Sequence, residues 1–321
     1  MQTMGPRVLV TENIHAVGWE TLKKEADAVA WPGQEKQPLL EAVKDAQAIL
    51  VRVAKLTPEV IQAAPHLKVI GKHGVGYDNI NIPAATARGV IVTNTPLANS
   101  MSVAEHALAL LLAVARRIGE SERDLVRGAV RAQKVYQGVE LSGKVMGVIG
   151  LGSAGLRLAR MTGNGLGMRV LGFDPYKEPW PDGIERCREV GPLLAQADFI
   201  SIHVPLTKET TNLIGRDALP KMKSTAILVN TARGGIVDEA AVADAVKAGR
   251  LAGAGLDVVV DEPLKPSHPL NGVPNIILTP HMAGVTEEAM MRMAQDAAED
   301  ILRVLRGERP KFPVNKELVK R

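Results

Sequence analysis

The stretch that decides the fold is residues 145–160, which read VMGVIGLGSAGLRLAR. Val145–Ile149 has the apolar, β-rich character of a buried strand, and a helix-like segment begins at Leu156. Gly150, Gly152 and Gly155 lie between the two. A G-x-G-x-x-G order between a strand and a helix predicts a dinucleotide-binding turn.

Each of the three glycines has its own reason to be glycine. Gly150 allows a tight turn, Gly152 lets the backbone approach a pyrophosphate, and Gly155 lets the helix pack closely on the strand. With Ser153 and Ala154 they begin a helix whose free N–H groups and positive dipole end attract an anion. We therefore expect this segment to bind the pyrophosphate of a dinucleotide.

An acidic residue follows the next predicted strand. Arg169–Phe173 is followed by Asp174, 19 residues after Gly155 (174 − 155), where a carboxylate would hydrogen-bond the ribose hydroxyls. A carboxylate there repels a 2′-phosphate, which favours NAD over NADP, although Lys177 leaves NADP tolerance open. The alternative is a simple turn residue before Pro175, and the upstream glycine motif favours the ribose role.

Outward from this segment, short apolar strands alternate with helix-like stretches. This pattern predicts an α/β fold of two doubly wound parallel-sheet domains, Rossmann-like or flavodoxin-like. We expect a nucleotide-binding domain over residues 101–290 and a discontinuous first domain over residues 1–100 and 291–321, completed by the last helix, Glu287 to about Leu305. The further predicted strands are Arg7–Thr11, Ala48–Val53, Leu67–Gly71 and Val90–Thr93 in the first domain, and Phe199–Val204, Ala226–Asn230, Gly253–Val258 and Ile276–Leu278 in the second.

Helices are also expected in three other stretches of the chain. Glu35–Asp45 and Pro58–Ala64 are amphipathic, and Thr57 is a sensible N-cap for the second of them. The third is expected from Val103 to about Arg116, because Ser102 and Glu105 have the spacing of a capping box. It is apolar nearly all round, so it is either a core helix or a dimer contact.

Composition narrows the function classes. The 321 residues are 46% hydrophobic and 23% charged with a net charge of +4, which is typical of a folded globular protein. Aromatic residues make up only 3% and there is no long Lys/Arg run, so we expect no nucleic-acid partner. The N-terminus lacks the apolar core of a signal peptide, the most apolar stretch (Ala107–Ala115) is too short to span a bilayer, and the one cysteine, Cys187, forms no intrachain disulfide. We expect a cytoplasmic protein with no membrane or metal site.

Three polar residues follow consecutive predicted strands of the second domain: Arg233, Glu262 and His281. Ligands bind at the carboxyl ends of strands in open α/β sheets, so these side chains are candidate catalytic groups. Each could be an ordinary loop residue, but three such placements in a dinucleotide fold favour function. Reduction of a 2-keto acid needs a proton donor, for which His281 is suited, a carboxylate such as Glu262 to orient it, and a cationic fork such as Arg233 for the substrate carboxylate.

These motifs together resemble the D-isomer-specific 2-hydroxyacid dehydrogenases, in the branch that includes phosphoglycerate dehydrogenase. The resemblance covers nearly the whole chain. It rests on Gly74-Val-Gly-Tyr-Asp-Asn79, Ser102-Val-Ala-Glu105, the glycine motif, His203-Val-Pro-Leu-Thr207, Asn230-Thr-Ala-Arg-Gly-Gly235, Gly255-Leu-Asp257 with Glu262-Pro263, and Thr279-Pro-His281.

The resemblance implies an NAD-dependent oxidoreductase that transfers a hydride between nicotinamide and a small D-2-hydroxy acid, such as hydroxypyruvate, glyoxylate or 3-phosphoglycerate in its keto or hydroxy form. It also implies two α/β domains with a cleft between them and a homodimer through the nucleotide domain. Arg233, Glu262 and His281 match the catalytic residues. The implied cofactor contacts are Asp174, His203, Val204, Pro205, Thr231, Ala232, Asp257, Gly284, Ser102 and the glycine motif, and the implied substrate contacts are Arg52, Lys72, His73, Gly74, Val75 and Gly76.

Two departures from the family pattern affect the expectations. Where phosphoglycerate dehydrogenases have Gly-Arg-Ala-Gly, this chain has Gly71-Lys72-His73-Gly74, which weakens the case for 3-phosphoglycerate but allows a second anion site. Lys72 and His73 could equally be a solvated strand end. The chain also ends soon after its last predicted helix, so we expect no C-terminal regulatory domain.

Two other function classes were weighed. A nucleotide-sensing binding protein of co-repressor type could use the same scaffold, and NADH binding without turnover would identify it. An L-specific lactate or malate dehydrogenase carries its nucleotide motif near the N-terminus, whereas here the motif begins at Gly150. The complete set of Arg233, Glu262 and His281 favours the D-specific enzyme.

Overall fold

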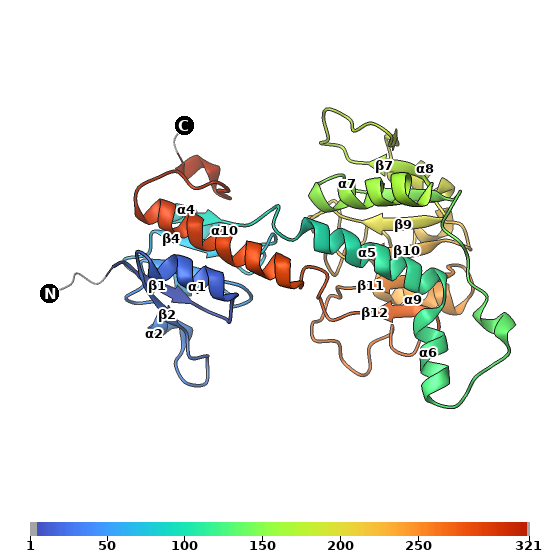
Figure 1. The fold of residues 1–321 in the computed structure, drawn as a ribbon, viewed down its shortest axis with the longest axis horizontal. Coiled ribbons are helices and arrows are strands. Elements are labelled where there is room, and N and C mark those ends of the chain that lie inside the picture. Colours follow the sequence, from blue (N-terminus) through green and yellow to red (C-terminus); the bar gives the residue numbers. More distant parts are fainter. Residues whose placement is uncertain (1–4, 320–321) are drawn as a thin grey trace. The chain divides into compact units, whose positions relative to one another are not determined.

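The computed structural model describes residues 5–319, so the first four residues of the segment examined for a signal peptide lie outside it. The chain forms two compact units (Figure 1). The first contains residues up to Asn99 and those from Val285 onward, and the second is Ser100–Gly284. Each unit is built on a parallel sheet, which confirms the expected α/β fold class.

The sheet of the first unit has five strands in the order β2-β1-β3-β4-β5. Its strands are β1 (Arg7–Val10), β2 (Asp27–Ala30), β3 (Ala48–Val51), β4 (Val69–Lys72) and β5 (Ile91–Thr93). Its helices are α1 (Ala16–Lys23), α2 (Leu39–Ala42), α3 (Pro58–Gln62), α4 (Ile82–Ala87) and α10 (Glu287–Leu305), followed by the short η4 (Lys316–Leu318).

Two local expectations for this unit were wrong. The strand β2 was not predicted, because its sequence DAVA lies half-buried at the sheet edge and carries no continuous apolar run. The helix expected over Glu35–Asp45 shrinks to the single turn α2, which begins after Pro38. The helix α3 begins as expected, since the Thr57 hydroxyl accepts the Val60 N–H.

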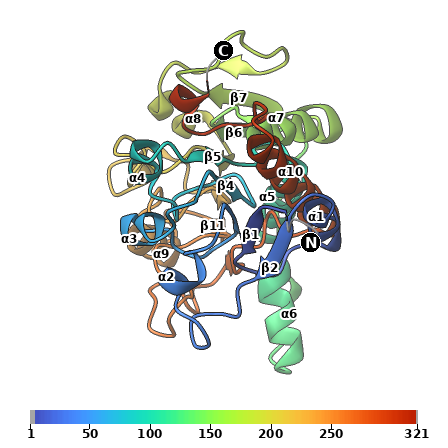
Figure 2. The same cartoon turned by 90° about the vertical axis from the view of Figure 1, so that its left-hand side faces the viewer.

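Helices cover both faces of this sheet. In Figure 2, α3 and α4 lie on one side of the strands and α1 and α10 on the other. The two corresponding apolar clusters are formed by α3, α4 and one face of the strands, and by α1, α10 and the opposite face. A strand that is covered on both faces must be apolar throughout, which explains why β3 and β4 are buried at every position.

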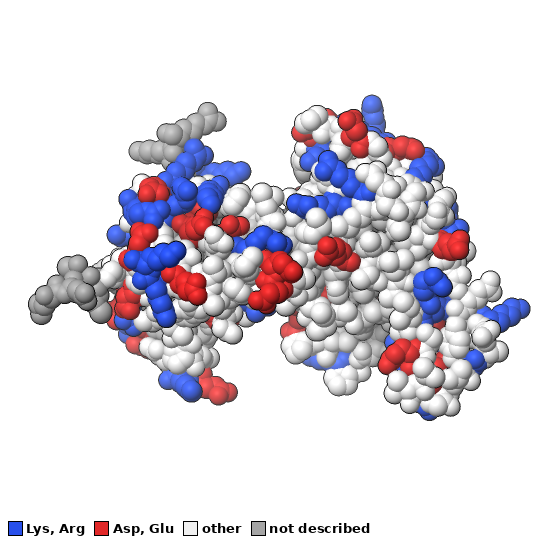
Figure 3. Space-filling view, viewed as in Figure 1, with Lys and Arg blue, Asp and Glu red and all other residues white. Residues whose placement is uncertain are grey.

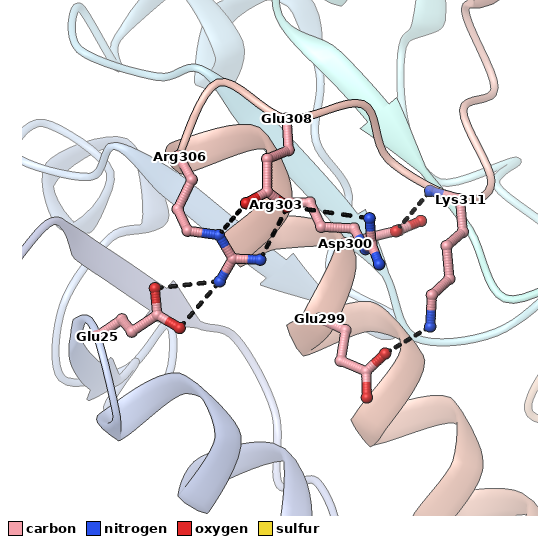
Figure 4. Close-up of polar contacts among 7 residues, drawn as sticks. All are labelled: Glu25, Glu299, Asp300, Arg303, Arg306, Glu308 and Lys311. Atoms are coloured by element: carbon pink, nitrogen blue, oxygen red, sulfur yellow. Dashed lines mark hydrogen bonds and ion pairs between the residues drawn. The ribbon is translucent and has the colours of Figure 1, made fainter.

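The C-terminal end of α10 is tied to the first sheet by charged residues (Figure 4). Asp300, only 1% exposed, accepts the backbone N–H groups of Lys311 at 2.7 Å and Phe312 at 3.0 Å. Arg306 bridges Glu308 and Glu25, the latter just before β2. The Asp300 bonds hold the segment after α10 to the helix, and the Arg306–Glu25 bond joins the helix to the first residues of the unit, beside the apolar cluster of α1 and α10.

The second unit holds a seven-stranded parallel sheet in the order β12-β11-β10-β9-β6-β7-β8. Its strands are β6 (Val145–Ile149), β7 (Arg169–Phe173), β8 (Glu185–Arg186), β9 (Phe199–Ile202), β10 (Ile227–Asn230), β11 (Gly253–Leu256) and β12 (Ile276–Leu278). The helical elements are α5 (Ser100–Ala115), α6 (Ile118–Val126), η1 (Gln133–Tyr136), α7 (Ser153–Arg160), η2 (Met161–Gly165), α8 (Val190–Gln196), η3 (Leu219–Lys221) and α9 (Glu239–Lys247). The chain builds outward from β6 on one side and then from β9 on the other, so the topological switch point lies between β6 and β9.

The helix α5 begins earlier than predicted. It starts at Ser100, so Ser102 lies inside its first turn and does not cap it. Most of its length packs in the apolar cluster that also includes Met146 and Val148 of β6. Of the two alternatives for this helix, the structure therefore supports the core position.

A projecting arm follows α5. Arg117, with φ of 52°, turns the chain into α6, which ends at Val126 and is followed by η1. Glu120, 8% exposed, accepts hydrogen bonds from Arg117 at 2.9 Å and Arg131 at 2.7 Å, and Asp124 accepts from Tyr136 at 2.8 Å. These bonds fold the arm back on itself.

On the face drawn in Figure 3, Lys and Arg side chains are interspersed with Asp and Glu side chains. Within residues 5–319, no helix is long and apolar enough to cross a membrane. The same residues contain no cluster of three or more His, Cys, Asp or Glu side chains suited to hold a metal ion.

Candidate active site

The glycine segment forms a tight connection between β6 and α7. Gly150 has φ of +92°, and a Cβ atom there would lie 2.5 Å from the backbone oxygen of His203. A Cβ on Gly155 would lie 2.0 Å from the backbone oxygen of Gly150. Both positions therefore require glycine for the protein's own packing.

Gly152 differs from its two neighbours in the motif. A Cβ atom at this position would meet no protein atom within 4 Å. Gly152 is the N-cap of α7, and no side chain caps this helix end. The open space and the uncapped N–H groups fit the pyrophosphate of NAD, which needs a close backbone approach at a helix N-terminus.

Asp174 holds the same turn from the end of β7. One carboxylate oxygen accepts the Leu151 N–H at 2.9 Å, and the other accepts the Tyr176 N–H at 2.9 Å. Each carboxylate oxygen has a second lone pair, so these bonds leave capacity for ribose hydroxyls. The position of Asp174 beside the glycine turn is compatible with its predicted role.

The segment His203-Val204-Pro205 follows β9, across the switch point from Gly150. The His203 ring accepts or donates a hydrogen bond to the Ser201 hydroxyl at 2.9 Å. Burial lowers the pKa of His203 to about 4, so the imidazole is neutral at physiological pH. An uncharged His203 side chain therefore lies beside the turn that the three glycines form.

The loop after β10 presents Arg233. The buried Asn230 side chain shapes it, because its oxygen accepts the Ala232 N–H at 3.0 Å and its amide donates to the Arg233 carbonyl at 2.8 Å. The Arg233 guanidinium is half-buried and donates one bond to the Ala232 carbonyl at 2.7 Å. The Thr231 hydroxyl is buried and has no hydrogen-bond partner among residues 5–319, which fits a site for a polar ligand group such as the nicotinamide carboxamide.

Asp257 organises the loop that carries His281. It is 1% exposed, and its carboxylate accepts the Thr279 hydroxyl at 2.6 Å and the N–H groups of Met282 at 2.9 Å and Ala283 at 2.8 Å. Burial alone would raise the pKa of Asp257, but the hydrogen bonds from His106, Thr279 and the backbone bring it below its usual value. The carboxylate is therefore charged and fixes the turn after β12.

His281 and Glu262 form a direct pair. The His281 Nδ1 lies 2.9 Å from Glu262 Oε2, and the two side chains are 49% and 39% exposed. His281 has φ of +52°, a conformation that is uncommon for residues other than glycine and that often marks a functional site. The pairing of Nδ1 with a carboxylate directs Nε2 away from Glu262, as a proton donor to substrate requires.

The predicted site residues thus fall into two groups. Those of the second unit, from the glycine motif to Gly284, follow β6, β7, β9, β10, β11 and β12, at the carboxyl edge of one sheet; only Ser102, buried within α5, does not follow a strand. The remaining predicted residues belong to the first unit: Arg52 follows β3, Lys72 is the last residue of β4, and residues 73–76 follow it.

The first-unit residues are tightly bonded. Glu12 accepts the backbone N–H groups of Arg52 at 2.7 Å and Ala54 at 2.6 Å. The Lys72 ammonium donates to the Arg52 carbonyl and to the Asn79 side chain. Lys72 therefore supports the Arg52 loop from within the protein.

The chain passes from a buried to an exposed position between His73 and Val75. His73 is 3% exposed, and burial, with the charges of Arg52 and Lys72, lowers its pKa to about 4. Gly74 donates to Thr95 at 3.1 Å and has φ of +130°, which carries the chain out to the exposed Val75.

Sequence reasoning missed several residues of these networks. His106 on α5 lies 3.0 Å from the Thr279 hydroxyl, although 173 residues separate them in the chain. Glu12 is likewise distant in sequence from the loop that it holds. A repeated pattern would not reveal such contacts, because only the folded chain brings the partners together.

The site can now be compared with known proteins. The family model for the D-isomer specific 2-hydroxyacid dehydrogenase, NAD binding domain, matches residues 108–283. A D-3-phosphoglycerate dehydrogenase of Archaeoglobus fulgidus is 44% identical over 310 residues, which cover 94% of this chain and 58% of the relative, so the chain spans little more than half of that protein. A glyoxylate reductase of Korarchaeum cryptofilum is 39% identical over 99% of this chain and 98% of its own length.

A solved structure adds a match in three dimensions. The D-lactate dehydrogenase of Aquifex aeolicus, complexed with NAD and lactic acid, is 30% identical, has a TM-score of 0.82, and is matched over 94% of this chain and 96% of its own. The family match includes the glycine cradle and extends through the His281 loop. The chain belongs to the D-isomer specific 2-hydroxyacid dehydrogenase family.

Proposed function

We propose that the protein catalyses NAD-dependent hydride transfer between a nicotinamide and a small D-2-hydroxy acid or its 2-keto acid. The observation that carries this proposal is the His281–Glu262 pair at 2.9 Å, held at the carboxyl edge of the sheet that also bears the glycine cradle. NAD, when bound, supplies or accepts the hydride. The protein's own residues must then bind the acid and handle one proton.

His281 is the proposed proton donor in the reducing direction. Hydride addition to a 2-keto carbon leaves negative charge on the carbonyl oxygen, and an imidazolium Nε2–H can protonate it. Glu262 accepts the Nδ1–H, which fixes the orientation of the ring and leaves Nε2 facing away from the carboxylate. In the oxidising direction the neutral ring accepts the same proton through Nε2.

Arg233 is proposed to bind the substrate carboxylate and to polarise the keto group. Its planar guanidinium has five N–H donors and forms paired hydrogen bonds with carboxylates. The Asn230 side chain fixes the backbone on both sides of the loop, so the arginine is presented from a rigid turn. In the first unit, the N–H groups of Val75 and Gly76 and the side chain of Arg52 are proposed as further substrate contacts.

Among 2-keto acids, we propose glyoxylate or hydroxypyruvate as better substrates than phosphohydroxypyruvate. Two observations support this choice. Lys72 already bonds the Arg52 carbonyl and Asn79, and His73 is buried with a pKa near 4, so it carries no positive charge for a second anion. The identity with the Korarchaeum cryptofilum glyoxylate reductase over nearly its full length points the same way.

The test is NADH oxidation by the purified protein with glyoxylate, hydroxypyruvate, phosphohydroxypyruvate and a dicarboxylic analogue, with NADPH in parallel. We expect turnover with the singly charged acids. Preference for a doubly charged acid would contradict the substrate choice and restore Lys72 and His73 as an anion site. Tight NADH binding with no turnover of any acid would contradict the enzyme proposal and support a nucleotide sensor.

We also propose that two copies of the chain associate through the arm of the second unit. Four apolar side chains on it are more than half exposed: Ile118, Leu125, Val126 and Val130. Apolar residues gathered on a projecting, internally bonded segment commonly mark a protein–protein interface. Light scattering after size-exclusion chromatography would test the dimer.

A further inference from the structure

The second unit contains a buried carboxylate that is not one of the proposed catalytic residues but lies close to the loops that carry them. Glu239, the first residue of α9, is 8% exposed. One of its oxygens accepts the Val260 N–H at 2.7 Å, and the other lies 2.9 Å from His268 Nε2. Burying a carboxylate costs free energy, which these two hydrogen bonds offset in place of water. The burial of Glu239 therefore needs an explanation.

Capping of α9 does not supply that explanation. The helix already has an N-cap, since the Asp238 side chain accepts the Ala241 N–H at 2.9 Å. Glu239 turns instead toward the loop after β11. His268 is held from its other side, because its Nδ1 accepts the Leu270 N–H at 3.4 Å. The imidazole therefore presents an Nε2–H that is directed at Glu239.

The peptide that Glu239 holds lies against the Arg233 loop and is adjacent to the peptide that bonds Glu262. A Cβ atom on Gly234 would lie 2.2 Å from the Val259 carbonyl carbon, so the loop of Arg233 rests directly on the peptide between Val259 and Val260. The adjacent peptide, between Val258 and Val259, supplies the Val259 N–H, which donates to Glu262 Oε1 at 3.2 Å. Glu262 Oε2 in turn holds His281 Nδ1 at 2.9 Å.

We propose that Glu239 and His268 are positioning residues for the reaction, a role that rests on the proposed function. They hold the peptide between Val259 and Val260 in place. Glu262 then stays within hydrogen-bonding distance of the His281 ring, and the Arg233 loop stays in its position against this peptide. A continuous chain of contacts leads from His268, whose side chain is 12% exposed, to the exposed His281. Loss of Glu239 lets this peptide shift, and the orientation of His281 is then no longer unique.

The test uses three variants of the full-length protein in complex with NADH. Glu239→Ala removes the acceptor of the Val260 N–H, whereas Glu239→Gln keeps an oxygen for that N–H and places its NH2 group, a donor, against His268, whose ring must then accept through Nε2. Asp244→Asn is the matched control, because Asp244 lies on the same helix with its side chain 57% exposed. Nitrogen-15 NMR of the neutral His281 ring, assigned with His281→Gln, reports which ring nitrogen carries the proton.

We expect wild type, Glu239→Gln and Asp244→Asn to show His281 in the Nδ1–H form, bonded to Glu262. Glu239→Ala should show a mixture with the Nε2–H form. Its kcat should fall about tenfold to hundredfold, the range for a small misplacement of catalytic groups, while KM and the Kd for NADH change little. His268→Ala removes only the hydrogen bond that supports Glu239, so its kcat should fall by a smaller factor. This variant replaces Glu239→Ala in the test if Glu239→Ala folds poorly.

The proposal is overturned if Glu239→Ala keeps a single Nδ1–H form and the wild-type kcat. It is also overturned if kcat and NADH affinity fall together in Glu239→Gln, since the pair would then stabilise the unit as a whole. If the wild type turns over no 2-keto acid, the proposed function fails, and the tautomer comparison still decides the positioning role by itself.

Discussion

The substitution Gly152→Ala separates what the glycine motif does for the fold from what it does for the cofactor. Gly152 has φ of −68° and ψ of −168°, a conformation open to any residue, and an added Cβ would meet no protein atom within 4 Å. Replacing glycine at a compatible site stabilises a protein by about 0.4–1 kcal/mol through the unfolded chain. We therefore expect the cofactor-free Gly152→Ala protein to unfold at or slightly above the wild-type temperature.

NADH binding by the same variant should be weakened. A methyl group at Gly152 occupies the space through which the pyrophosphate reaches the backbone. Loss of one hydrogen bond to a charged group costs about 1.5–3 kcal/mol, which corresponds to about a tenfold to hundredfold rise in Kd. Fluorescence titration with NADH measures this change directly.

Gly155→Ala is the matched comparison. Its Cβ would lie 2.0 Å from the Gly150 oxygen, so the backbone must move, and we expect a loss of about 1–3 kcal/mol in stability. A thermal scan without cofactor should rank Gly155→Ala well below Gly152→Ala. If Gly152→Ala bound NADH like the wild type, or if both variants were equally destabilised, the assignment of the pyrophosphate to this turn would be wrong.

Three further results are expected. His281→Ala should lose about 10²–10⁴-fold in kcat and keep its NADH affinity in a titration, and unchanged turnover would remove its acid–base role. Burial lowers the pKa of His73 to about 4 in the folded protein. Below about pH 6.5 the unfolded chain therefore binds a proton at this residue that the folded chain does not bind. The free energy of unfolding decreases as the pH falls from there toward 4. In urea titrations, lowering the pH from about 7.5 to 5 should reduce the free energy of unfolding of His73→Gln by about 2 kcal/mol less than that of the wild type. Equal reductions in the two proteins would refute this reasoning. Leu125→Asp should give monomers in light scattering with NADH binding intact, whereas an unchanged dimer would place the interface elsewhere.

The strands and the cofactor turn were accessible from the sequence because their signals are local. The strands β6, β7 and β12 have the predicted bounds, since each is a short apolar run between turn residues. The strand β8 has two exposed residues and carries no such run, so it was missed. The capping-box signal at Ser102 was misleading because the helix begins at Ser100, three residues before the predicted start at Val103.

Within the site, the sequence determined the kinds of residue and the strands that they follow. It placed Arg233, Glu262 and His281 after consecutive strands, because parallel strands bring their carboxyl ends to one edge. Only the tertiary structure decided which side chains pair: Asp257 with the turn after β12, Lys72 with the Arg52 loop, and Glu239 with a peptide 21 residues away. Hydrogen bonds act over about 3 Å and leave no periodic trace in the chain, so such partners become visible only once folding has brought them together.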